Sequence, residues 1–234
     1  METSTRAMAR TVNPTVHALR RDEFIDAAMR LIQTQGYEQL SIGDILAELG
    51  ASKGAFYHYF DSKQSLLEAV VDRMTGTMEE LVAPILGDPT LSALEKLQRL
   101  FTSTVRWKTE RRDLLIGLLA TWQSDDNAVV RQKVARKSAG ALTAQIARIV
   151  RQGMDEGTFA LAHPDELAHV VVSMVLEFGQ TNADLYLAYH AGRVERQDVE
   201  RLVATYTLAL ERILGLQPGS LTLLDADALR AWFA

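Results

Sequence analysis

Apolar residues recur along this chain at intervals of three and four positions, and Gly and Pro residues divide the pattern into segments. The first segment has one apolar face, formed by Phe24, Ala27, Ala28, Leu31 and Ile32. Gly36 follows that face and is a suitable helix end. No alternation of apolar and polar residues indicates a strand. The pattern therefore predicts an all-α fold.

Residues 41–67 predict two short helices, a tight turn and the start of a third helix. Ser41 is a good N-cap, and Asp44 can complete a capping box with it. The first short helix has an apolar face made of Ile42, Ile45, Leu46 and Leu49. Gly50 can end it in the left-handed conformation, and Ser52 can cap the next helix. This arrangement is typical of a helix-turn-helix, whose second helix reads DNA.

The second short helix separates packing residues from candidate DNA contacts. Phe56 and Phe60 point inward, whereas the small or polar residues that suit close approach to base edges lie opposite. Lys63 lies in the first turn of the following helix, where free N–H groups favour phosphate. The DNA-binding candidates are Ser41, Ser52, Lys53, Gly54, Ala55, Tyr57, His58, Tyr59 and Lys63, with Tyr59 expected mainly in the core.

Beyond this segment the pattern remains helical almost to the end of the chain. The helix that begins near residue 62 is expected to reach about Val82, where Pro84 and the 87–89 turn break it. Further helices are expected over about 92–108, 113–122, 127–156, 164–189, 195–214 and 226–232.

Two of the late helices have apolar faces wide enough to pack against a second copy of the chain. The alternative is that both faces are buried within one subunit, and the width of the faces does not decide between the two. A dimer is favoured because paired readers contact half-sites about one DNA turn apart. The dimerisation candidates are Val171, Met174, Phe178, Leu202, Tyr206, Leu210 and Ile213.

The middle helices are rich in large aromatic residues, which line small-molecule sites but also fill the cores of helical bundles. The candidates for a ligand site are Met78, Phe101, Trp107, Trp122, Phe178, Asn182 and Tyr186.

Composition and charge constrain the picture only weakly. The 234 residues carry a net charge of −5, so DNA affinity would have to come from a few well-placed donors. Residues 1–20 are weakly periodic and rich in Arg, and we interpret them as a disordered basic arm that either contacts DNA or has no role. The chain has no cysteine, no apolar run of membrane-spanning length and no signal-peptide core, so a cytoplasmic protein is expected.

Catalysis is the rival class of function, and the sequence gives it little support. The chain has no GxSxG elbow, no phosphate-binding Gly loop and no HExxH motif, and we expect no cofactor. His163, Glu166 and His169 have a spacing that would allow metal binding, but a helix start explains them more simply, and no metal site is predicted. A helical adaptor that binds a protein partner is a further alternative for the C-terminal part.

The segment GYEQLSIGDILAELGASKGAFYHYFDSKQSLL resembles the N-terminal domain of the tetracycline-repressor (TetR) family of bacterial regulators. The resemblance covers about residues 24–71. It implies a homodimer that binds a palindromic operator in double-stranded DNA and senses a small molecule. We therefore expect a disordered arm at 1–20, a helix-turn-helix domain at 21–68 and a helical ligand-binding and dimerisation domain at 69–234. The hypothesis is a non-enzymatic repressor that a small, largely apolar or aromatic effector releases from DNA.

Overall fold

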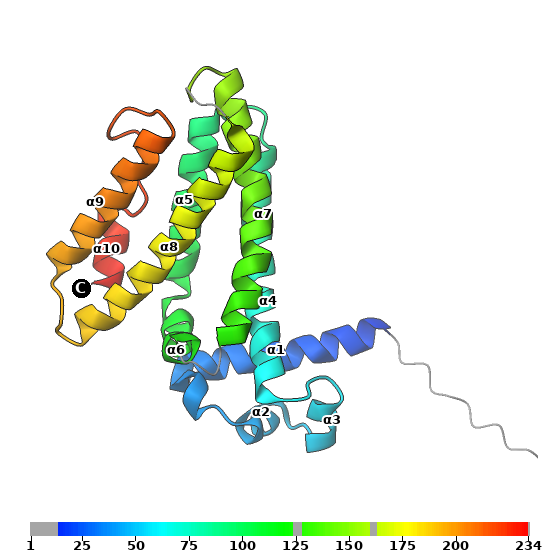
Figure 1. The fold of residues 1–234 in the computed structure, drawn as a ribbon. Helices are drawn as coiled ribbons and strands as arrows, with labels where there is room; N and C mark the ends of the chain where they lie inside the picture. The colour runs from blue at the N-terminus through cyan, green and yellow to red at the C-terminus, as the bar shows by residue number, and fades with distance from the viewer. Residues whose placement is uncertain (1–13, 124–127, 160–162, 234) are drawn as a thin grey trace, which may run out of the picture.

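The computed structural model describes residues 14–123, 128–159 and 163–233 (Figure 1). These ranges contain ten α-helices and no β-strand, which confirms the all-α prediction. The helices are α1 (Pro14–Gln39), α2 (Ile42–Leu49), α3 (Lys53–Tyr57), α4 (Lys63–Gly87), α5 (Ala93–Glu110), α6 (Arg112–Gln123), α7 (Ala128–Asp155), α8 (Pro164–His190), α9 (Arg196–Ile213) and α10 (Ala226–Trp232).

The expected caps shape the first helices. Ser41 and Asp44 form the reciprocal capping box at the start of α2, and Gly50 ends that helix with a φ of 58°. Ser52 caps α3 by accepting a hydrogen bond from the Ala55 N–H. Gly36 has a φ of 78° and interrupts the helical geometry of α1 where the sequence predicts a helix end. Local chemistry therefore sets these boundaries.

Two expected boundaries are wrong. Helix α4 continues through Pro84 to Gly87, although Pro84 was expected to break it. Proline removes only one helical hydrogen bond here, and the buried Val82 and partly buried Leu86 hold both flanking turns against the core of the large domain. Helix α1 begins at Pro14, a residue suited to a first helical turn, so residues 14–20 of the expected arm are helical. The remainder of that arm, residues 1–13, lies outside the described residues.

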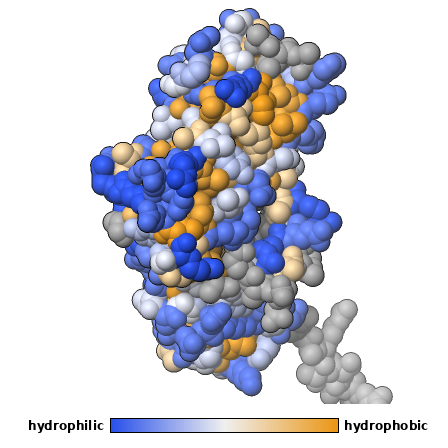
Figure 2. Space-filling model, turned by 60° about the vertical axis from the view of Figure 1, so that its left-hand side comes forward, coloured by the Kyte–Doolittle hydropathy of each residue, from blue (hydrophilic) through white to orange (hydrophobic). Residues whose placement is uncertain are grey.

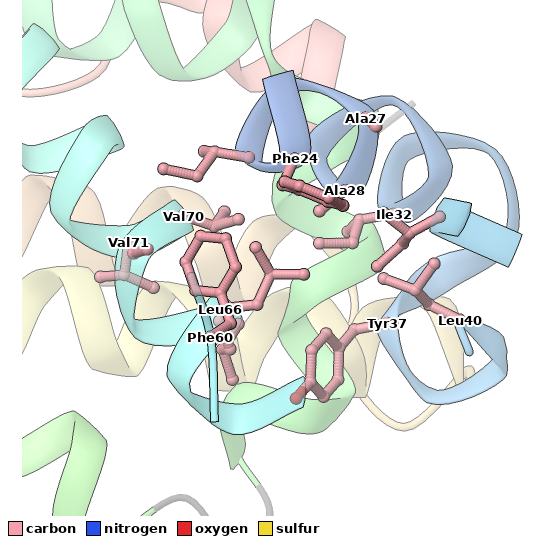
Figure 3. Close-up of a cluster of buried hydrophobic side chains, with 14 of the residues drawn as sticks. Phe24, Ala27, Ala28, Ile32, Tyr37, Leu40, Phe60, Leu66, Val70 and Val71 are labelled. Atoms are coloured by element: carbon pink, nitrogen blue, oxygen red, sulfur yellow. The ribbon is translucent and has the colours of Figure 1, made fainter. Parts of the chain in front are cut away.

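The helices α1–α3 and the start of α4 form a small head around an aromatic core (Figure 3). Phe24 of α1 meets Phe56 of α3 edge to face, with ring centroids 5.7 Å apart, and both side chains are fully buried. Phe60 and Leu66 extend this contact to the start of α4. Because Phe56 is fixed at the centre of this core, the opposite face of α3 must point away from it.

Helix α6 joins the head to the rest of the molecule, and the described helices pack most extensively where α6 meets α1 (Figure 1). Leu114 and Leu118 of α6 belong to the same buried cluster as Phe24. Between them, Gly117 lies so close to Ile32 that a Cβ atom there would overlap the Ile32 carbonyl oxygen. Glycine at position 117 is therefore what allows the two helix backbones to approach each other.

The large domain consists of α4, α5 and α7–α10 above the head (Figure 1). Its main buried cluster includes Leu97 and Phe101 of α5, Ile146 of α7 and Val171 of α8. Helix α10 closes one side of the domain, where Phe233 is buried beside Tyr186 and the Trp232 indole donates a hydrogen bond to the Thr109 hydroxyl at 3.0 Å.

We expect Gly117→Ala to lower the free energy of unfolding by about 1–3 kcal/mol, because the added methyl group overlaps backbone rather than a flexible side chain. Urea unfolding followed by circular dichroism measures the change. Gly76→Ala in α4 is the matched control, since a Cβ there meets nothing within 4 Å and alanine favours the helix. Equal stability of the two variants would contradict the close approach of α6 to α1.

Candidate DNA-binding surface and ligand cavity

The outer face of α3 presents small and polar groups to solvent. Ser52, Lys53, Gly54, Tyr57 and His58 are exposed, and Tyr57 retains 46% of its accessible surface. Exposed small residues let a helix backbone approach base edges, while hydroxyl, ammonium and imidazole groups can donate to phosphate or to bases. The exposed face of α3 therefore has the shape and chemistry of a major-groove reader.

The donors on this face lie together. The Lys53 ammonium is 6.0 Å from the centre of the Tyr57 ring on the next turn of α3. Ala55, the remaining candidate on α3, is half-buried and packs against the core of the head. Lys53 and Tyr57 are the two donors of this helix best placed to reach a phosphate backbone.

Ser41 has a structural role that limits its use as a DNA contact. Its hydroxyl donates to the Asp44 carboxylate at 2.7 Å, and its backbone N–H donates to the same oxygen at 2.8 Å. These two hydrogen bonds hold the pKa of Asp44 below its ordinary value. Both donors of Ser41 are thus engaged in capping α2.

Lys63 and Tyr59 are also engaged within the head. The Lys63 ammonium donates to the Glu38 carbonyl at 3.4 Å and lies 4.2 Å from the centre of the Tyr37 ring. Burial lowers the pKa of Lys63, while Glu38 and Asp44 act in the opposite direction. Tyr59 is half-buried and packs against Phe24, in keeping with its expected core position.

The first turns of α1 add a residue that the sequence interpretation missed. His17 lies against His58 and Tyr59, with ring centroids 5.2 and 4.6 Å away. A helical reading of residues 14–20 would have revealed it, since His17 lies seven residues before Phe24 and therefore on the same helix face. This packing extends the exposed surface of α3 onto the start of α1.

A second feature is a cavity of about 540 Å³ inside the large domain. Its walls are mainly apolar side chains from α4–α10. All seven residues expected at a ligand site line it: Met78, Phe101, Trp107, Trp122, Phe178, Asn182 and Tyr186. Both its volume and its apolar lining are typical of small-molecule sites.

A few polar groups interrupt the apolar wall. The indole N–H of Trp107 and the amide oxygen of Asn182 are buried and have no hydrogen-bond partner. Burial raises the pKa of the Tyr186 hydroxyl, an effect that nearby Arg112 partly offsets. Lys108 also lines the cavity and was not among the expected residues. Its position seven residues after Phe101 on α5 was the available signal.

The structure divides the expected dimerisation residues into two groups. Val171 and Leu210 retain 0% and 1% of their accessible surface inside the core of one subunit, so their assignment to a dimer contact is corrected. The heptad pattern identified the face of α8 that packs inward rather than the face that remains free. The half-buried candidates are Met174, Phe178, Leu202, Tyr206 and Ile213.

Apolar side chains also remain exposed on the two late helices. Val170 and Leu176 of α8 and Leu208 of α9 retain between 36% and 47% of their accessible surface. Figure 2 shows apolar patches among hydrophilic side chains on one face of the molecule. Because Leu176 also lines the cavity, only Val170 of α8 and Leu208 of α9 are referred to below as the α8/α9 patch.

The described ranges contain no group of three or more His, Cys, Asp or Glu residues placed to hold a metal ion. None of the helices in these ranges combines the length and the apolar composition that a membrane crossing requires.

Comparison with protein families gives two matches in this chain. Residues 24–70 match the family described as bacterial regulatory proteins, tetR family, and residues 94–203 match the tetracyclin repressor-like C-terminal domain. The first match covers the head from Phe24 onward, and the second covers most of the helices that line the cavity.

Individual relatives agree with these matches. The chain is 35% identical over 74 residues to the HTH-type transcriptional regulator YvaF of Bacillus subtilis, covering 32% of this chain and 38% of YvaF. It is 28% identical over 123 residues to the HTH-type transcriptional repressor KstR2 of Rhodococcus jostii, covering 48% of this chain and 60% of KstR2. The chain thus spans less than two thirds of the length of these relatives.

The fold is also found among solved structures. A TetR-family transcriptional regulator from Pectobacterium atrosepticum superposes with a TM-score of 0.66 at 22% identity, over 88% of this chain and 99% of that one. A TetR transcription regulator from Haloarcula marismortui superposes with a TM-score of 0.64 at 19% identity, over 85% of this chain and 97% of that one.

We expect Lys53→Ala to weaken DNA binding on all sequences and to reduce the slope of log affinity against log salt by about 1, as the loss of one phosphate contact does. Fluorescence anisotropy at several salt concentrations measures both effects. Arg99→Ala is the control, because it removes one positive charge from an exposed position of the large domain on α5. An unchanged salt slope in Lys53→Ala would mean that Lys53 does not contact phosphate.

Proposed function

Because this chain belongs to the tetR family of bacterial regulatory proteins, which are DNA-binding transcriptional regulators rather than enzymes, we propose that it is a dimeric repressor released from its operator by a small molecule. The head supplies the DNA-binding surface, and the cavity in the large domain receives the effector. The observation that carries this proposal is that one helix, α6, belongs to both sites.

Helix α6 contacts both the cavity and the core of the head. Leu115, Ile116 and Leu119 line the cavity. Leu114 and Leu118 are buried in the core of the head, and Leu118 lines the cavity as well. A helix is rigid over this length, so a ligand that displaces the cavity face also displaces the face packed on α1. The close backbone contact at Gly117 leaves α1 little room to absorb the displacement.

The proposed mechanism is a shift between two arrangements of the head relative to the large domain. In one arrangement the two α3 helices of a dimer match the spacing of the operator half-sites, and in the other they do not. An effector that binds the second arrangement more tightly lowers operator occupancy by its differential affinity. Helix α4 moves with the head as well, because Arg73 pairs with Asp22 and Asp26 of α1.

The α8/α9 patch is the proposed centre of the dimer contact. A single five-residue α3 offers few DNA contacts, so specific binding favours two copies held at a fixed spacing. Two neighbouring helices with exposed apolar residues can form a four-helix bundle with their own copy. The half-buried Met174, Leu202 and Ile213 lie on the same helices and are proposed to flank the contact.

Fluorescence anisotropy of the full chain on DNA from upstream of its own coding region tests the proposed function, with a scrambled duplex as control. The measurement is then repeated with compounds that were selected because they raise the melting temperature of the protein. We expect salt-dependent binding selective for the upstream duplex and a loss of binding when a stabilising compound is added. Stabilising compounds that leave operator binding unchanged would contradict regulation through the cavity.

We expect Leu208→Arg to convert the dimer to a monomer and to lower operator affinity at least about tenfold, because a charge cannot be buried in an apolar contact without a partner. Sedimentation velocity measures the oligomeric state. Leu19→Arg, which places the same charge at an exposed leucine of α1, is the matched control for dimerisation. A Leu208→Arg variant that remains dimeric would place the contact elsewhere.

A further inference from the structure

Lys108 stands in the wall of the cavity. It follows Phe101 by seven residues and Thr104 by four on α5, so the three side chains share one helix face, and all three line the cavity. The Lys108 side chain is exposed at the cavity wall. The protein atoms around it lower the pKa of its ammonium group by desolvation.

Within the described residues, no hydrogen bond or ion pair engages the Lys108 ammonium. Other partly or fully buried lysines do have partners: the Lys96 ammonium donates to the Gln152 side-chain oxygen at 2.9 Å, and the Lys63 ammonium donates to the Glu38 carbonyl. Glu79 also lines the cavity, and among the described residues it forms no ion pair with Lys108. A partly desolvated cation without a partner favours a bound anion, which would supply that partner.

Two further groups in the cavity wall lack partners. The Trp107 indole N–H can only donate, and the unpartnered atom of Asn182 is its amide oxygen, which accepts. Buried polar groups in folded proteins are normally satisfied, so these two atoms are available to a polar group of a ligand. The apolar cavity thus offers one cation, one N–H donor and one amide oxygen acceptor.

We propose, on the premise that the cavity is the effector site of the proposed repressor, that the effector is an amphipathic monocarboxylic acid whose carboxylate pairs with the Lys108 ammonium and whose apolar body fills the rest of the cavity. One cation matches one negative charge, whereas a phosphate dianion is usually held by several donors or by the forked guanidinium of arginine. The apolar walls from α4, α6 and α8 match a hydrocarbon or aryl body.

The test uses the full chain and two acids, each with its neutral counterpart: decanoate against decanol, and 2-naphthoate against 2-naphthylmethanol. Quenching of the fluorescence of Trp107 and Trp122, both in the cavity wall, reports binding. We expect at least one acid to bind at least about tenfold more tightly than its neutral counterpart, the gain expected of a charge-assisted hydrogen bond in a desolvated site. Neither acid binding, or binding no tighter than the alcohols, would overturn the proposal.

Substitutions at position 108 test whether Lys108 is responsible for the preference for acids over alcohols. Lys108→Met keeps most of the side-chain volume without charge and should lower the affinity for the acid at least about tenfold while leaving the alcohol unchanged. Lys108→Arg, which keeps the charge, should retain most of the acid preference and guards against a general loss of folding. Arg99→Met, which removes a positive charge from the same helix at an exposed position outside the cavity wall, is the control. An acid preference that survives in Lys108→Met would overturn the role of Lys108.

Operator binding separates this inference from the proposed function. If the acid binds through Lys108 but leaves operator occupancy unchanged, the ligand class stands and the proposed regulation fails. If neutral apolar compounds release the operator and the acids do not bind preferentially, the proposed regulation stands and the ligand class fails.

Discussion

The close approach of α6 to α1 is the constraint on which the arrangement of this molecule depends. Gly117 brings the two backbones together, and Leu114 and Leu118 on either side complete the core of the head. A side chain at position 117 would separate the helices and would open the contact between the head and the large domain. Since α6 also lines the cavity, the same helix contacts both the cavity and the core of the head.

The cores of the head and of the large domain are packed differently. The head has a closed aromatic core around Phe24 and Phe56, with helix ends held by capping boxes, so it holds α3 in one orientation. The large domain leaves a cavity of about 540 Å³ among its apolar side chains. A cavity forfeits dispersion contacts and therefore stability, which a bound molecule can restore. The head therefore has a closed core, whereas the large domain contains a cavity.

In both the head and the large domain, the charged and polar groups relevant to binding lie at a few positions. The chain has a net charge of −5, yet Lys53 and Tyr57 form a donor face on α3, and Asp44 is occupied by Ser41 in the cap of α2. Within the cavity, Lys108 is an unpaired cation in a largely apolar wall. The fields that matter for binding come from these positions rather than from the whole-chain sum.

The sequence by itself determined the features that depend on neighbours along the chain. The caps at Ser41 and Ser52, the left-handed Gly50, the inward Phe56 and the outward Lys53 follow from helix geometry and local hydrogen bonds, and they could be predicted. Only the tertiary structure decided the features that depend on distant residues. Pro84 stays within a helix because its flanks are buried, Val171 faces its own core rather than a second copy, and the partner of Gly117 is Ile32 on a helix far earlier in the chain. Lys108 becomes a cavity residue only when α5 packs with helices distant in the sequence, because helical periodicity identifies a face but not what that face meets.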